Sequence, residues 1–335
     1  MNFDRNRLIP GLVFVLMGTT MVGCSELLVN GPESNTNGAD FQTVSQLVKY
    51  RYAFLSFKQV NWDSLTIAYR PAAMSSHGDE IYPVLMSLLG TLRDGHVELR
   101  TEGGFPVVAY KPPRFQNGKQ FSPLVVRSYF DGDLNLAGDG NIDYGIIPGN
   151  IGYVYISTFT DGSWVREFDG VLNSLLSTKG LIVDVRNNTG GNGSQVDFVV
   201  GRFISSNISY NMYNPDGSIH GTATIVPRSV RYQQPVVVLI NGMSFSAGEM
   251  FPVLMKQVPS VRTVGDTTGG GGGSNDVFPL PSGRRLRMPV NYFTKANGEM
   301  VEWNGVAPDI VVPQTEDDLR SGHDQQLETA LGLLR

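Results

Sequence analysis

An unbroken apolar run that leads into small residues and then into a helical pattern constrains this chain most. Residues 237–240 show no polar alternation, which is typical of a strand covered on both faces. Residues 241–248 then predict a tight elbow, and residues 249–256 have helical spacing. Ser246 in such an elbow would stand at a helix N-terminus, where free backbone N–H groups favour a developing oxyanion. A plain helix cap at Ser244 or Ser246 explains the same residues, so this segment leaves both interpretations open.

A second buried strand ends in a glycine-rich segment. Residues 180–186 are apolar except at the end, residues 187–193 contain Gly190 and Gly191, and a helical pattern follows. Glycines at a strand exit let the backbone present bare N–H groups. A phosphate-binding loop is a weak alternative because no Gly-Lys-Ser/Thr is present, whereas an ordinary Asn/Gly turn remains open.

His96 is the one histidine in an apolar setting. It follows an amphipathic helical pattern over residues 81–92 and has Asp94 two positions before it. The other three histidines lie in polar, turn-rich surroundings at positions 77, 220 and 323. A histidine after a helix can be structural or catalytic, and its own segment does not decide between them.

These segments together resemble the C-terminal processing, or tail-specific, serine protease family. The closest resemblance is to its tricorn core protease and interphotoreceptor retinoid-binding protein branch. Residues 182–191 are similar to the family's Arg-Asn-Gly-Gly signature, residues 246–249 to its Ser-Ala-x-Glu elbow, residues 92–96 to its Leu-x-Asp-Gly-His segment, and residues 302–310 to its closing motif. The resemblance covers about residue 40 to the C-terminus. It implies an α/β fold with a crotonase-like catalytic core (Clp/crotonase superfold) and a small N-terminal helical domain.

The resemblance also implies roles for individual residues. Ser246 corresponds to the nucleophile, His96 to its general base and Glu302 to the acid that orients the base, directly or through an intermediary. Asp94 is a possible support, because Gly95 stands where the tricorn branch has a serine. The backbone N–H of Ala247, with that of Gly190 or Gly191, would form the oxyanion hole. We expect no metal and no cofactor.

A serine–lysine dyad is not expected. The processing-protease branch has a lysine about two dozen residues after its serine, and here residues 269–273 are all glycine. Lys256 lies ten residues beyond Ser246 on the same expected helix, well off the face of the serine. The glycine tract itself fits either a flexible loop or backbone that lies close to bound substrate.

The N-terminus predicts a bacterial cell-envelope protein. Two arginines precede a short apolar run, so residues 1–23 are interpreted as a lipoprotein signal peptide. Small residues before Cys24, the only cysteine, resemble a lipobox and imply lipidation of that thiol. An unmodified cysteine is the alternative. Residues 24–39 are expected to be a flexible tether, with the protein lipid-anchored at the outer membrane or the periplasmic face.

The rest of the chain divides into three expected parts. Residues 40–99 predict an N-terminal helical domain and residues 100–150 a β-rich connection, which is too short for a PDZ module. Residues 151–335 alternate strands with helices and predict an α/β serine peptidase core.

Two functions remain open. The first is a membrane-tethered serine endopeptidase that hydrolyses peptides or unfolded protein segments through an acyl-enzyme. The alternative is a non-catalytic lipoprotein on the same scaffold that binds a hydrophobic ligand or a peptide. With 26 basic and 31 acidic residues, the chain has no electrostatic footprint for nucleic acid. The oligomeric state does not follow from the sequence.

Overall fold

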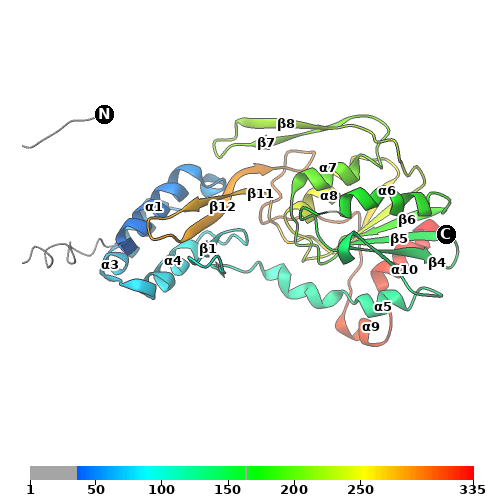
Figure 1. Cartoon of the computed structure of the whole chain (residues 1–335), viewed down its shortest axis with the longest axis horizontal. Coiled ribbons are helices and arrows are strands. Elements are labelled where there is room, and N and C mark those ends of the chain that lie inside the picture. The colour runs from blue at the N-terminus through cyan, green and yellow to red at the C-terminus, as the bar shows by residue number, and fades with distance from the viewer. Residues whose placement is uncertain (1–35, 163) are drawn as a thin grey trace, which may run out of the picture.

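A seven-stranded sheet forms the centre of the larger of two lobes (Figure 1). The computed structural model describes residues 36–162 and 164–335. The sheet order is β13 (Ile310–Val311), β10 (Val261–Gly265), β9 (Val236–Ile240), β6 (Gly180–Asp184), β5 (Ile151–Ile156), β4 (Ile142–Ile147) and β3 (Asn135–Ala137). The first five strands are parallel, and β4 and β3 are antiparallel additions. The predicted α/β class is therefore confirmed.

Helices cover both faces of this sheet. Helices α6 (Trp164–Leu175), α7 (Gly193–Val200) and α8 (Ala247–Met255) share a core with Val183 and Val238. Helices α5 (Pro123–Arg127) and α10 (Gln325–Leu334) pack with Ile182 and Val237 on the other face. Every residue of β6 and β9 is buried. This two-sided cover explains why both strands lack polar alternation.

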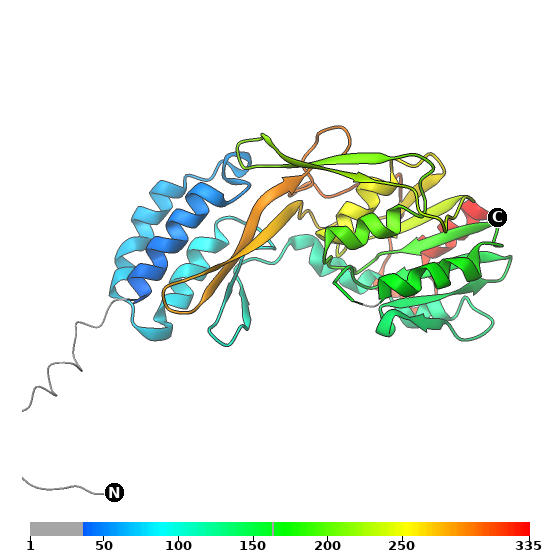
Figure 2. The ribbon, with the colours of Figure 1, turned by 45° about the horizontal axis from the view of Figure 1, so that its top comes forward.

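The smaller lobe consists of helices and a long β ribbon (Figure 2). Its helices are α1 (Thr36–Arg51), α2 (Leu55–Lys58), α3 (Trp62–Ser75), η1 (Gly78–Glu80) and α4 (Ile81–Gly90). The ribbon is the hairpin of β11 (Gly273–Pro279) and β12 (Arg285–Phe293). Leu286 and Met288 of the ribbon complete the hydrophobic core of the helices. This ribbon belongs to the expected core, residues 151–335, but packs with the helices of the expected N-terminal domain.

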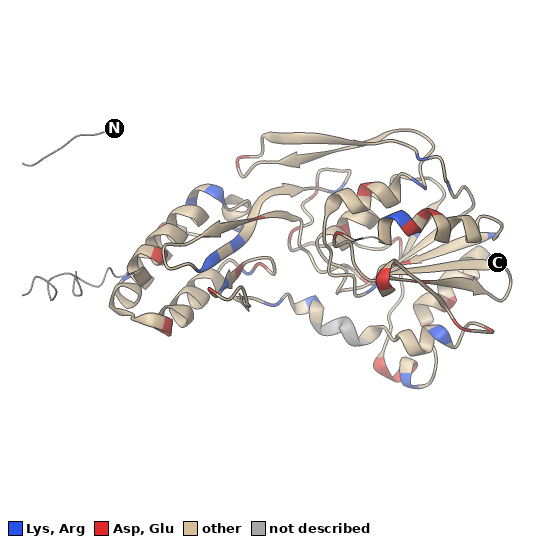
Figure 3. Ribbon diagram, viewed as in Figure 1, with Lys and Arg blue, Asp and Glu red and all other residues tan. Residues whose placement is uncertain are grey.

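A second sheet joins the lobes. Its order is β2 (Pro106–Val108), β1 (Glu98–Arg100), β12, β7 (Ile208–Tyr213) and β8 (Ile219–Ile225), with β11 on β12 as well. Strand β12 pairs with β1 at one end and with β7 at the other. Charged residues are spread over both lobes (Figure 3).

The expected β-rich connection, residues 100–150, is partly helical. It contains η2 (Pro113–Gln120), α5 and η3 (Gly138–Gly140) besides three strands. The apolar residues 123–126 lie in this segment, for which strands were expected, and they form part of α5. Ser122 caps this helix, because its Oγ accepts the Val125 N–H at 3.4 Å, and Pro123 suits the first helical position.

The expected tether, residues 24–39, overlaps the first helix. Residues 36–39 belong to α1, where Asn37 and Asp40 are buried. Asn37 Nδ2 donates to Ser76 Oγ at 3.2 Å, and Asp40 accepts the Ser282 N–H at 3.0 Å. The expected signal peptide, Cys24 and the remainder of the tether lie outside the described residues. In the part of the chain that is described, no helix has both the length and the apolar character needed to cross a membrane.

Candidate active site

Ser246 occupies a strained elbow between β9 and α8. Its backbone has φ 57° and ψ −122°, a conformation that non-glycine residues rarely adopt. The chain enters the elbow from a buried parallel strand and leaves it in a helix. This is the strand–turn–helix context in which a nucleophilic serine is exposed.

Ser244 is structural. Its Oγ donates to Val185 O at 2.8 Å and accepts the Asn241 N–H at 3.1 Å. The Phe245 N–H donates to Asn188 O at 3.0 Å. These bonds attach the serine elbow after β9 to the glycine-rich loop after β6. The two segments that the sequence singled out are therefore held side by side.

Ala247 and Gly191 are the candidate oxyanion donors. Among the described residues, neither backbone N–H has a hydrogen-bond acceptor. Gly190 N–H, by contrast, donates to Asn188 Oδ1 at 2.9 Å, so of the two glycines that the sequence offered, Gly191 is the one whose N–H is free among the described residues. Ser246, Ala247 and Gly191 all line one cavity of about 730 Å³. A substrate carbonyl in this cavity would meet the hydroxyl and both free donors.

His96 contacts Phe245, the residue before Ser246 in the elbow. Only 2% of His96 is exposed, and its ring packs against Phe245 with centroids 4.5 Å apart. Neither ring nitrogen has a hydrogen-bond partner in the described residues, so the imidazole is not bonded to Ser246 in this state. Burial lowers the pKa of His96 from the ordinary 6.5 to about 4; Asp94 opposes the shift, whereas Arg287 and Lys58 add to it. The imidazole is therefore neutral at neutral pH, as a general base must be.

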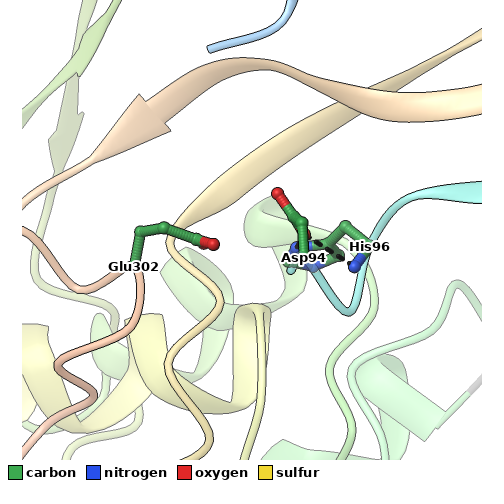
Figure 4. Close-up of side chains that lie close together, drawn as sticks. All are labelled: Asp94, His96 and Glu302. Carbon is green, nitrogen blue, oxygen red and sulfur yellow. Dashed lines mark hydrogen bonds and ion pairs between the residues drawn. The ribbon is translucent and has the colours of Figure 1, made fainter. Parts of the chain in front are cut away.

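The two acids expected near His96 are both there (Figure 4). Ligand atoms of Asp94, His96 and Glu302 lie within 4.8 Å of one another. Asp94 Oδ1 is 3.8 Å from His96 Nδ1 and accepts the His96 backbone N–H at 2.8 Å. Glu302 Oε2 has no partner among the described residues. The sequence left open which acid orients the base, and the structure places both beside it.

The two acids differ in their proton affinity. Burial raises the pKa of Glu302 well above its ordinary value, Asp94 raises it further, and Lys58 opposes both. Burial also acts to raise the pKa of Asp94, but Lys58, His96 and the Tyr52 hydroxyl outweigh it, and the net pKa is lowered. The pair therefore holds one carboxylate ionised and the other inclined to keep a proton.

Sequence reasoning missed Lys58. This residue ends α2, and its Nζ lies 2.5 Å from Glu302 Oε1 and 3.4 Å from Asp94 Oδ2. Its only local signal is a lysine among the aromatic residues of an apolar segment. Three ligand atoms within 4.8 Å would suit a metal, but the Lys58 ammonium already bridges the two carboxylates, and we assign no metal there.

Lys256 is engaged elsewhere, as expected. Its Nζ forms an ion pair with Asp309 and a hydrogen bond to Thr263 Oγ1 at 3.2 Å. This pairing ties the end of α8 to β10 and to the segment before β13.

The glycine tract at residues 269–273 is buried and closely packed, so it is not the flexible loop that was one of its two interpretations. All five glycines are buried. The Glu249 carboxylate accepts the N–H groups of Gly270 and Gly271 at 2.8 and 2.6 Å and that of Ser246 at 3.1 Å. A Cβ on Gly271 would stand 2.2 Å from the Phe245 ring and 2.9 Å from His96 Cε1. Only glycine lets the tract lie against both rings.

The sequence profile of peptidase family S41 matches residues 150–312. Residues 150–312 are a peptidase family S41 domain. The domain carries the elbow, both candidate oxyanion donors and Glu302, whereas His96 and Lys58 come from the part of the chain before it. Family S41 domains are serine-type peptidase domains.

Named relatives of the S41 domain are proteases. The carboxy-terminal processing protease CtpA of Bacillus subtilis is 30% identical over 196 residues, covering 53% of this chain and 41% of the relative. Tricorn protease homolog 1 of Streptomyces coelicolor is 30% identical over 187 residues, covering 55% of this chain and 17% of the relative. The chain thus spans less than half the length of these relatives.

A solved structure matches nearly the whole length of the chain. It is that of a candidate peptidase from Parabacteroides merdae, with 28% identity and a TM-score of 0.76, and the match covers 89% of this chain and 96% of the other. The S41 domain and the lobe before it therefore recur together in another protein.

Proposed function

We propose that this chain is a serine endopeptidase that hydrolyses peptides or unfolded protein segments through an acyl-enzyme at Ser246. The observation that carries the proposal is the strained Ser246 elbow, whose cavity is also lined by Ala247 and Gly191, two residues whose N–H groups have no acceptor in the described part of the chain. A helix cap needs neither strain nor free donors, whereas nucleophilic attack needs both an exposed hydroxyl and an oxyanion site.

The proposed reaction has two halves. Ser246 Oγ attacks the substrate carbonyl carbon while His96 takes the hydroxyl proton, and the carbonyl oxygen becomes an oxyanion bound by Ala247 and Gly191. The C–N bond then breaks, and His96 returns the proton to the leaving amine. Water hydrolyses the resulting ester by the same steps in reverse order. Asp94, the ionised acid of the pair, stabilises the imidazolium that forms in each half, and Glu302 lies beside the ring.

Labelling with a fluorophosphonate probe tests the nucleophile. We expect the wild-type chain to be labelled covalently and Ser246→Ala to lose the label, with unchanged circular dichroism. Ser274→Ala is the matched control, because Ser274 lines the same cavity and should keep the label. A folded wild-type chain that is never labelled would instead support a non-catalytic ligand-binding protein on this scaffold.

We also propose the finer features that the resemblance implied. The core is crotonase-like and lacks a PDZ module, which is supported by the five parallel strands and by the short segment between β2 and β4. Cys24 is lipidated and holds the protein in the bacterial cell envelope, at the outer membrane or the periplasmic face. Cys24→Ser should then release the protein from the membrane fraction, and unchanged fractionation with the same N-terminus would contradict lipidation.

A further inference from the structure

Lys58 is a fully buried cation at the junction of the two lobes. Its side chain has no exposed surface, and it reaches the active site from α2, outside the S41 domain. Besides the two carboxylates, its Nζ donates to Tyr52 Oη at 2.9 Å and to Leu92 O at 3.0 Å. The rings of Tyr52, Phe54 and Trp303 enclose it at 5.1 to 5.6 Å. Each donor position of the ammonium is therefore committed.

The two carboxylate oxygens of Asp94 have different partners. Oδ2 binds the Lys58 ammonium and accepts the Tyr52 hydroxyl at 2.7 Å, whereas Oδ1 is the oxygen that faces His96. The two oxygens of Glu302 also differ: Oε1 binds Lys58, and Oε2 has no partner among the described residues. A buried charge is stable only when it is paired, so Lys58 and the two acids hold one another in place.

We infer that Lys58 is a positioning residue, whose ammonium holds the carboxylates of Asp94 and Glu302 beside His96, the residue that accepts the Ser246 proton. The catalytic part of this inference rests on the proposed function. The electrostatic part, that Lys58 adds to the effect of burial and of Arg287 in holding His96 neutral, does not depend on hydrolysis.

The charges around His96 predict the effect of removing Lys58. The titratable and charged groups that face the ring or its acids are Asp94, Glu302, Lys58, Arg287, Tyr52 and Glu249. Lys58 and Arg287 are the cations among them, and each lowers the pKa of His96. Without the ammonium, the ionised Asp94 would face the imidazole with one cation fewer nearby and would favour its protonated form.

The decisive experiment is an NMR titration of the His96 Cε1–H resonance in the full chain, assigned with His96→Gln. We expect the wild type to titrate near the pKa of about 4. Lys58→Met, which keeps the stem and removes the charge, should raise this pKa by about one unit or more, a tenfold gain in proton affinity. Lys58→Arg should stay near the wild type. Lys256→Met is the matched control, since it removes another ion-paired lysine and should leave the titration unchanged.

The pH profile of hydrolysis supplies a second readout. In Lys58→Met the acid limb of kcat/KM should move upward with the His96 pKa, and kcat should fall more than KM rises. A purely structural lysine would lower the yield of folded protein without moving either limb. If the wild type hydrolyses nothing, the proposed function fails, and the NMR titration alone decides the electrostatic part.

A second variant covers the case in which Lys58→Met does not fold. Lys58→Met/Glu302→Gln removes both members of the 2.5 Å pair, a change that buried ion pairs tolerate better than the loss of one partner. Asp94 remains, so the His96 pKa should again rise by about one unit. An unchanged His96 titration in a folded single or double variant overturns the inference.

Discussion

Gly190 and Ser246 are in van der Waals contact across the ends of β6 and β9. A Cβ placed on Gly190 would stand 2.8 Å from the Ser246 Cβ and 2.9 Å from the Ala247 nitrogen. Gly190 also has φ +103°, a region that suits glycine. Its contribution is therefore the space it leaves for the elbow, because its own N–H is used by Asn188.

Gly190→Ala should damage the elbow. The added methyl group meets backbone atoms that cannot move aside, so we expect about 2 kcal/mol of lost stability. The rate of fluorophosphonate labelling should fall on the order of 100-fold, because Ala247 N–H is displaced from the oxyanion. Gly170→Ala on α6 is the control, since no atom lies within 4 Å of its Cβ and alanine favours a helix. Wild-type labelling in Gly190→Ala would refute this role.

Replacing Ser246 by glycine should stabilise the chain relative to Ser246→Ala. Alanine keeps the strained φ of 57°, whereas glycine adopts it without a clash. We expect Ser246→Gly to have the higher free energy of unfolding by about 1 kcal/mol, although Ala→Gly changes usually destabilise. Urea unfolding of the two inactive variants gives the comparison. A less stable glycine variant would mean that the elbow is unstrained.

His96→Ala should lose activity and Lys256→Ala should keep it. Loss of the base is expected to lower kcat/KM on the order of 100-fold or more. Lys256 Nζ is paired with Asp309, so its removal should leave the catalytic rate near the wild-type value. Peptide hydrolysis by the two purified variants makes the test. The opposite pattern would restore a serine–lysine mechanism.

The burial of neutral His96 should make stability depend on pH. Its pKa is about 4 in the folded chain, below the ordinary 6.5 of an exposed imidazole. The unfolded chain therefore binds more protons between these values, and the stability from His96 is lost as the pH falls from 6.5 towards 4. From about pH 7 to about pH 4.5 the wild type should lose roughly 2 kcal/mol more than His96→Gln. Urea unfolding of both proteins at the two pH values measures the difference.

That comparison also removes the effect of other acids. Burial raises the pKa of Glu249 from 4.5 to about 6, although Thr268 and three backbone N–H groups oppose the shift. Its stability contribution therefore falls as the pH rises through that range, opposite to the effect of His96. Since Glu249 is present in both proteins, its contribution cancels. Equal losses in both would show that His96 is not a buried neutral group.

The elements that carry the S41 signature were predictable because their signals are local. Strands β6 and β9 are continuous apolar runs, and the elbow at Ser246 follows one of them within a few residues. The position of His96 was also predictable, because it follows the amphipathic pattern of α4 within a few residues. Apolar residues 123–126 misled the prediction, because a serine cap and Pro123 favour a helix there over a strand.

The sequence by itself determined the α/β class and the serine elbow between a strand and a helix, since strand burial and turn chemistry depend on adjacent residues. Only the tertiary structure decided that Lys58 joins Asp94 and Glu302, which are 36 and 244 positions away along the chain. It also decided that Gly191, and not Gly190, offers the free N–H, because Asn188 folds back onto the nearer glycine. Such contacts depend on how two lobes pack around a buried charge, and no local pattern in the chain records that packing.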